Sequence, residues 1–188
     1  MYPSARKWTG LAIEGLFIPC ADIGPMNEVR PSSVLLIGRF QPFHKGHEKI
    51  ISYLLRRYSN VTIVIGSAQE KRTKENPFSA VERKQMIRRL VNSHAGWGKR
   101  IKFANLADNR SNFAWVRAVC SRFPSSRFAI ASANSLVRRL LKNADYRPDP
   151  SPLFRRAEWE GKRIRKKIRG KGKFKPEKGP SSFEKNIP

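Results

Sequence analysis

The sequence contains few cysteines, few acidic residues and no long apolar run. Cys20 and Cys120 are its only cysteines, so at most one disulfide can form, and a cysteine-rich zinc site is excluded. This usage favours a reducing compartment, and we expect the cytoplasm. No stretch approaches the roughly 20 apolar residues that a transmembrane helix requires, so we expect no membrane span.

The scarcity of acidic residues leaves a large positive charge. Against 14 Asp and Glu stand 39 Lys and Arg, so the chain of 188 residues has a net charge of +25. Such a balance predicts an anionic partner: a phosphate compound, a polynucleotide or an anionic surface. Because 39% of the residues are hydrophobic and 11 of them are Phe, the chain as a whole is not disordered but has a folded core.

The patterning divides the chain into three parts. Residues 1–30 show neither a strand period nor a helix period, so we expect an N-terminal extension without regular structure, and Met26 is a candidate start of the functional chain. Residues 31–169 carry the patterned part and predict one domain. The remainder, 170–188, has the composition of a basic, disordered tail.

Short apolar runs alternate with helical periodicity across the patterned part. Strands are predicted over 33–37, 61–65, 101–106 and 128–131, and helices over 46–58, 79–91, 112–122, 135–143 and 155–169. Ser79 followed by Glu82 is typical of a capping box, and the plain interpretation of Asn76 and Arg83 is that they cap and solvate that helix. Strands apolar on both faces that alternate with helices predict a parallel sheet covered on both sides. The expected fold is a Rossmann-like α/β three-layer sandwich that binds ligands at the carboxyl ends of its strands.

The most informative segment is GRFQPFHKGH, residues 38–47, between the first strand and its helix. Helix N-termini attract phosphate, so His44 and His47, with Arg39 nearby, are suited to hold a polyphosphate, while Gly38 and Gly46 let the backbone approach it. The plainer alternative is that both histidines only cap the helix. The third histidine of the chain lies far along the sequence, so we expect no metal site made of protein ligands. Walker A and dinucleotide-binding glycine motifs are absent.

With IGSAQEKRTKENPFSAVER after the second strand, this segment resembles the archaeal-type nicotinamide-nucleotide (NMN) adenylyltransferases of the HxGH nucleotidylyltransferase superfamily. Further matches are NFAWV, SANSLV and the Ile-Arg of GKRIR, and the resemblance runs from about residue 34 to 169. It implies transfer of AMP from ATP to NMN, giving NAD and pyrophosphate, with Mg²⁺ as the helper ion. It also implies a tendency to form homo-oligomers.

The resemblance implies three groups of site residues. The catalytic residues would be Arg39, His44, His47 and Arg165, the other ATP-binding residues Gly38, Phe40, Gly46, Ser132, Lys162 and Arg163, and the NMN-binding residues Asp108, Asn112 and Trp115. An indole can stack on the positively charged nicotinamide ring, although Trp115 is equally suited to the core beside its apolar neighbours.

One segment departs from the family pattern. Where the family has Ser-Gly-Thr ahead of its Ile-Arg, this chain has Glu160, Gly161 and Lys162, so both hydroxyl donors to the triphosphate are missing. Either Lys162 and Arg163 replace those hydrogen bonds by charge, or tight ATP binding is lost.

Two alternative functions follow from the same residues. The first is another HxGH transferase, acting on pantetheine phosphate, a flavin nucleotide or a glycerol phosphate. The second is a scaffold of weakened activity that binds RNA through residues 155–178, where Lys and Arg interleave with Trp159 and Phe174. A solvated basic tail explains the same composition.

Overall fold

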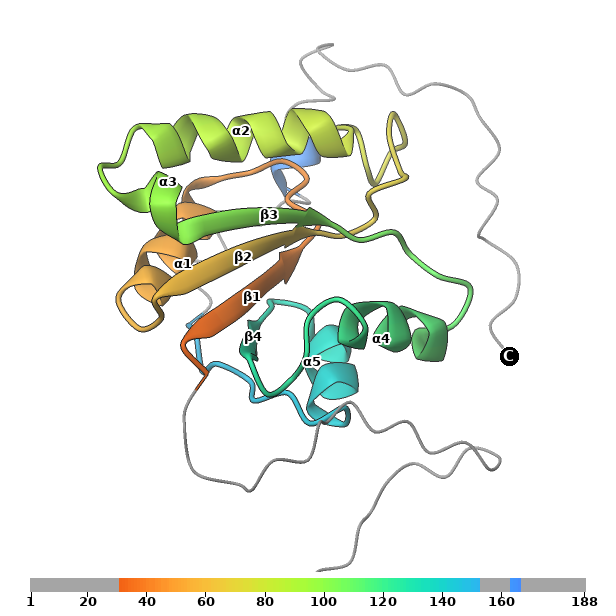
Figure 1. Ribbon diagram of the computed structural model, residues 1–188. Helices are drawn as coiled ribbons and strands as arrows, with labels where there is room; N and C mark the ends of the chain where they lie inside the picture. The colour runs from red at the N-terminus through yellow and green to blue at the C-terminus, as the bar shows by residue number, and fades with distance from the viewer. Residues whose placement is uncertain (1–30, 153–162, 167–188) are drawn as a thin grey trace, which may run out of the picture.

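The computed structural model describes residues 31–152 and 163–166 (Figure 1). Its elements are β1 (Ser33–Gly38), α1 (Lys45–Leu55), β2 (Asn60–Ile65), α2 (Ala80–Asn92), α3 (Trp97–Arg100), β3 (Ile101–Asn105), α4 (Asn112–Cys120), β4 (Phe128–Ala131) and α5 (Ser135–Lys142). The predicted extension 1–30 and tail 170–188 lie outside the described residues. Of the predicted helix 155–169, residues 163–166 are described, and they are helical.

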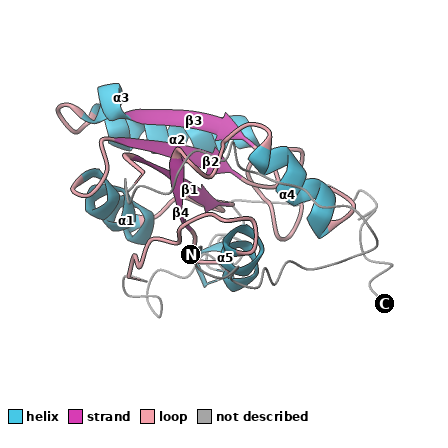
Figure 2. Cartoon of the chain, turned by 60° about the horizontal axis from the view of Figure 1, so that its bottom comes forward, coloured by secondary structure: helices cyan, strands magenta, loops and turns pink. Residues whose placement is uncertain are grey.

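The four strands form one parallel sheet in the order β3-β2-β1-β4. In Figure 1, α2 lies on one side of the sheet and α4 and α5 lie together on the other, and Figure 2 shows the same division from below. Two clusters of buried side chains fill the spaces between these layers. The predicted Rossmann-like α/β three-layer sandwich is therefore confirmed.

The alternation of side chains along β1 explains both clusters. Val34 and Leu36 join the cluster that includes Ile51 of α1 and Ile87 of α2. Leu35 and Ile37 alternate with them and belong to the second cluster, together with side chains of α4 and α5. Since successive side chains of a strand point to opposite faces, a continuous apolar run is needed to fill both layers. Such a central strand leaves the polar groups of the chain at its two ends.

Two sequence predictions need correction. The strands are not all apolar on both faces, because β3 exposes Lys102 and Asn105; this strand is at the edge of the sheet and has less of its surface covered. The turn after α2 also contains a short helix, α3, that the periodicity missed. With four residues, α3 is too short to carry a helical period, and it is held by tertiary contacts such as Trp97 against the core.

None of the helices in the described parts of the chain, 31–152 and 163–166, is long and apolar enough to cross a membrane.

The capping box predicted at Ser79 is present at the start of α2. The Ser79 hydroxyl accepts a hydrogen bond from the Glu82 N–H at 3.3 Å, and the Glu82 carboxylate accepts one from the Ser79 N–H at 2.8 Å. Arg72 donates to the same carboxylate at 2.9 Å. The box therefore fixes the start of the helix and ties it to the loop that follows β2.

We expect Ser79→Ala to lower the free energy of unfolding by about 1 kcal/mol, because two amide donors at the start of α2 lose a partner or its orientation. Urea denaturation followed by circular dichroism measures the change. Ser93→Ala, at the exposed end of the same helix, is the matched control and should change the value by less than about 0.5 kcal/mol. Equal effects of the two substitutions would contradict the capping role.

Candidate active site

A cleft of about 720 Å³ lies at the carboxyl ends of the strands. The cleft is lined by residues from the segments that follow the four strands: 38–47 after β1, 66–67 after β2, 108–115 after β3 and 132–140 after β4. The chain runs from β1 outwards to β2 and β3 and then returns to place β4 on the other side of β1. The cleft thus occupies the switch point at which open α/β sheets bind ligands.

Most of the predicted site residues line this one cleft. They are Gly38, Arg39, Phe40, His44, Gly46, His47, Asp108, Asn112, Trp115, Ser132 and Arg165. Arg163 is exposed and does not line the cleft, and Lys162 lies outside the described residues. Arg165 Nη1 donates a hydrogen bond to the Gln41 carbonyl oxygen at 2.7 Å. The cleft therefore brings together residues that are 124 positions apart in the sequence.

The two histidines form a stacked pair at the start of α1. Their ring centroids are 3.7 Å apart, and the rings of Phe40 and Phe43 pack against His47. The Nδ1 atom of His47 accepts a hydrogen bond from the His44 N–H at 3.3 Å, which leaves Nε2 to carry the proton of the neutral ring. His47 therefore caps the helix with one nitrogen and keeps the other as a donor, so the capping interpretation and the binding interpretation hold together.

Burial keeps both imidazoles neutral. It lowers the pKa of His44 to about 4 and that of His47 to about 3, and the neighbouring His44 lowers the latter further. His44 Nδ1 is buried and finds no hydrogen-bond partner in the described part of the chain. Positive charge at the cleft therefore comes from Arg39, Arg138 and Arg165, whereas the imidazoles contribute N–H donors.

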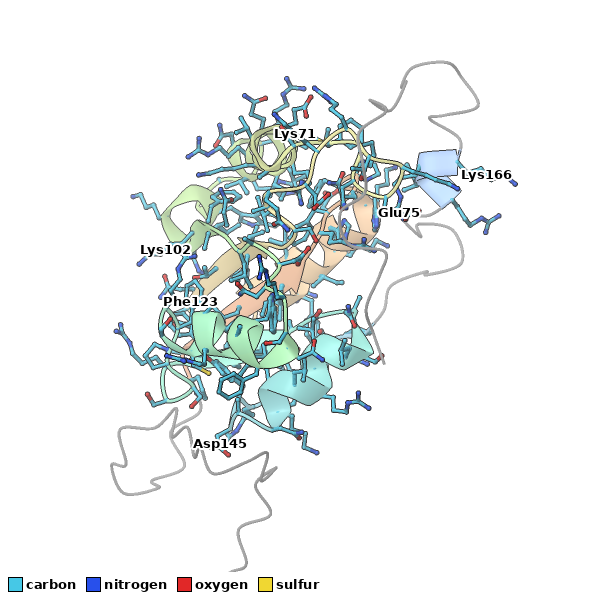
Figure 3. All side chains as sticks on the ribbon, turned by 90° about the vertical axis from the view of Figure 1, so that its right-hand side faces the viewer. Lys71, Glu75, Lys102, Phe123, Asp145 and Lys166 are labelled. Carbon is cyan, nitrogen blue, oxygen red and sulfur yellow. The ribbon has the colours of Figure 1, made fainter. Side chains whose placement is uncertain are left out.

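Arg165 is nearly buried and carries a carboxylate on its outer side. Its Nη2 atom lies 3.3 Å from Oε2 of Glu75, a residue of the loop between β2 and α2 whose side chain is 59% exposed. Figure 3 shows Glu75 beside the described helical segment 163–166. The guanidinium thus has a carbonyl group and a carboxylate among its partners.

Gly38 and Phe40 have a packing role that the sequence did not reveal. The Phe40 ring is buried in the core, and a Cβ atom on Gly38 would lie 3.2 Å from its Cζ. Phe40 has a φ of 52°, an uncommon conformation for a residue with a side chain. The side chain of Phe40 therefore belongs to the core, although the residue also lines the cleft.

Trp115 combines the two roles that the sequence left open. The indole packs against the cluster between the sheet and α4, and it also lines the cleft. Asp108 is the only carboxylate among the lining residues of the described chain, and its N–H donates to Oε1 of Gln69 at 3.1 Å. The end of the cleft near β3 is therefore aromatic and anionic, while the end near α1 and Arg165 is cationic.

Three residues with clear roles in this site were missed or misjudged from the sequence. Gln41 exchanges two hydrogen bonds with the backbone of Phe78 at 2.7 and 3.0 Å and so joins two loops. Arg138 donates to the Ser132 carbonyl at 2.7 Å and lines the cleft. The expectation that Arg83 only solvates its helix is wrong, because the side chain is fully buried behind the loops. A basic residue on the apolar face of α2 is the signal that identifies Arg83.

Comparison with known proteins places this site in a family. Residues 35–120 match the cytidylyltransferase-like family. A nicotinamide-nucleotide adenylyltransferase from Archaeoglobus fulgidus is 38% identical over 135 residues, which are 70% of this chain and 77% of the relative. Another from Thermoplasma volcanium is 35% identical over 87% of this chain and 85% of the relative.

A solved structure agrees with this assignment. A bifunctional NMN adenylyltransferase/ADP ribose pyrophosphatase from Francisella tularensis, complexed with AMP and a manganese ion, aligns with a TM-score of 0.63 and 26% identity. The alignment covers 73% of this chain and 41% of that protein, so it spans about two fifths of the length of the bifunctional relative.

The strand-helix junction with its paired histidines, the cleft at the switch point and the extent of these matches agree, and the chain belongs to the nicotinamide-nucleotide adenylyltransferase family.

Proposed function

We propose that this protein transfers AMP from ATP to NMN, giving NAD and pyrophosphate. The observation that carries the proposal is the single cleft that joins a histidine pair and arginines at one end to Asp108, Asn112 and Trp115 at the other. The names of the relatives point to the same acceptor, and they favour it over pantetheine phosphate and flavin nucleotides.

The reaction requires a direct displacement at phosphorus. An oxygen of the NMN phosphate forms a bond to the α-phosphorus of ATP, the bond from that phosphorus to the bridging oxygen breaks, and pyrophosphate leaves with the electron pair. No protein nucleophile is needed, because positioning and stabilisation of negative charge supply most of the catalysis in such transfers. The cleft offers the groups that this chemistry uses.

The roles divide between neutral and charged donors. His44 and His47 donate N–H groups to phosphate oxygens as neutral imidazoles, because burial lowers the pKa of both rings. Arg39 and Arg165 supply the positive charge that balances the leaving pyrophosphate. Phe40 and Gly46 present backbone to the nucleotide, and Ser132 lies across the cleft after β4.

A divalent ion would reach this site with the nucleotide. In the described residues no group of three or more His, Cys, Asp or Glu side chains is arranged to hold a metal, and Asp108 is the one carboxylate on the described wall. Mg²⁺ is commonly bound through substrate phosphates and water, so we assign MgATP as the substrate. When bound, the ion neutralises phosphate charge.

At the acceptor end, we expect Trp115 to stack on the nicotinamide ring. The ring of NMN is positively charged, so an indole face attracts it, as does the carboxylate of Asp108. Asn112 at the start of α4 adds an amide that can orient the ligand.

Incubation of the purified chain with MgATP and NMN should yield NAD, detected by chromatography. Nicotinic acid mononucleotide, pantetheine phosphate, flavin mononucleotide and glycerol phosphate are tested beside it. His47→Ala should lower kcat about 100-fold or more, because a donor to the transferred phosphate is lost.

The third histidine supplies the control for that experiment. His94 stacks on Trp97 and does not line the cleft, so His94→Ala should keep the activity of the original chain. A folded chain that produces no NAD from NMN, or that adenylylates another acceptor faster, would refute the proposed function.

Nucleotide binding should raise the pKa of both histidines. In the free chain, NMR titration should give values near the low ones caused by burial, about 4 for His44 and about 3 for His47. Phosphate charge favours the imidazolium, so a saturating non-hydrolysable ATP analogue should move both values upward. The same linkage makes the analogue bind more tightly as the pH falls through this range. Free-chain values near the ordinary 6.5, or values that ignore the analogue, would contradict the assignment.

The Glu75 carboxylate should weaken ATP binding, because it lies 3.3 Å from a phosphate-binding arginine. Glu75→Gln removes the negative charge and should lower the KM for ATP about two- to fivefold, the range expected of a partly exposed ion pair. Steady-state kinetics measure the change. Glu70→Gln, which lies in the same loop and removes the same charge without touching the Glu75 ion pair, is the matched control. A KM for ATP that rises in Glu75→Gln would show that the carboxylate instead holds Arg165 in its productive position.

A further inference from the structure

Arg83 is a fully buried cation whose surroundings are backbone carbonyl groups. Its Nη1 atom donates to the carbonyl oxygens of Arg39 and Gly66, both at 2.8 Å. Nη2 donates to the Ser67 carbonyl at 3.0 Å, and Nε donates to the Ser79 carbonyl at 3.1 Å within the first turn of its own helix. A single side chain of α2 therefore connects the segment after β1 with the segment after β2.

The two segments that Arg83 connects are those that shape the base of the cleft. Phe40 and Ser67 have φ values of 52° and 47°, in the left-handed region that residues with side chains rarely adopt. The N–H of Gly66 also donates to the Gly38 carbonyl at 2.9 Å, so the segments are directly paired. Such conformations persist when surrounding contacts determine them, and here the guanidinium supplies three of those contacts.

The fold alone does not account for a cation at this position. The helix face around Arg83 packs Ile87 and Val91 into the core, and an apolar side chain would fill it without burying a charge. Burial lowers the pKa of Arg83 to about 10, so the side chain remains charged at neutral pH. A buried charge that satisfies carbonyl groups of two functional loops indicates a role in the geometry of those loops.

The geometry of the peptide unit shows which way the N–H groups of Phe40 and Ser67 point when Arg83 binds the carbonyl groups before them. In a trans peptide the C=O and the N–H of one unit point in opposite directions. The carbonyls of Arg39 and Gly66 point at Nη1, so the N–H groups of Phe40 and Ser67 point away from Arg83. Within the described ranges neither N–H has a hydrogen-bond partner. Their residues line the cleft, whereas Arg83 does not.

We propose that Arg83 is a positioning residue that turns these two peptide units, so that the N–H groups of Phe40 and Ser67 face the cleft as a pair of donors for an anionic phosphate. The inference rests on the proposed function in one respect: it assigns the pair to the phosphate that is transferred. Backbone donors held in this way lose little freedom on binding, which suits a group where charge develops.

The test compares Arg83→Lys with Arg88→Lys in the full chain. Arg88 is exposed on the same helix, one turn further on, with its guanidinium over the Phe103 ring. A lysine in place of Arg83 cannot reproduce the fork that reaches both loops, so kcat for NAD formation should fall about 100-fold, the cost of misplacing a reacting group by about 1 Å. The KM for NMN should change little, because the acceptor end of the cleft is untouched. Circular dichroism verifies that both variants are folded.

A binding measurement separates this inference from the proposed function. Adenosine monophosphate carries the phosphate that is transferred, and its addition to the ¹⁵N-labelled chain should shift the amide signals of Phe40 and Ser67. The shifts should disappear in Arg83→Lys but persist in Arg88→Lys. An inactive chain that gives this pattern refutes the adenylyl transfer and keeps the role of Arg83. An active chain in which folded Arg83→Lys matches the original kcat and the original shifts refutes the role of Arg83 alone.

The remaining outcomes are also decisive. If kcat falls only in proportion to the loss of folded protein while the KM values are unchanged, Arg83 is a stabilising residue and the inference is wrong. If Arg83→Lys does not fold, the original chain is still tested: saturating adenosine monophosphate that leaves the Phe40 and Ser67 amides unmoved overturns the donor pair.

Discussion

The structure depends on the burial of β1 and β2 on both faces. A strand covered by helices on each side has no surface for polar side chains, so the polar groups of the chain gather where the strands end. Because all the strands are parallel, their carboxyl ends meet at one edge, and the segments after each of them share one cleft. The arrangement explains why residues as distant as His44 and Arg165 become neighbours.

Within that cleft, the structure separates proton donors from charges. The apolar rings of Phe40 and Phe43 beside His47 exclude water from the imidazole pair and keep it neutral. Arg39 is exposed, whereas Arg138 and Arg165 donate to backbone carbonyl groups. A triphosphate bound as proposed would meet N–H groups near the helix terminus and positive charge further along, an arrangement suited to stabilising negative charge that moves during a transfer.

Arg165 lies close in sequence to the segment in which we expect a departure from the family pattern. Glu160 and Lys162 stand in place of two hydroxyl residues, and they lie outside the described residues, as does most of the basic segment 155–178. Arg165 itself has the Gln41 carbonyl and the Glu75 carboxylate among its partners, and both residues lie far from that segment in the sequence. Membership of the family and a locally altered phosphate site are therefore compatible.

Local sequence patterns were enough to predict the strand-helix order, the capping box at Ser79 and the junction that holds His44 and His47, because side-chain periodicity and unpaired backbone groups set these features. A resemblance indicated Asp108, Asn112 and Trp115. The folded structure was needed to establish the protonation of the histidines, the core position of the Phe40 ring, the exposure of β3 and the carbonyl partners of Arg83. Each of these depends on which distant segments surround a side chain, and burial of that kind leaves no local pattern in the sequence.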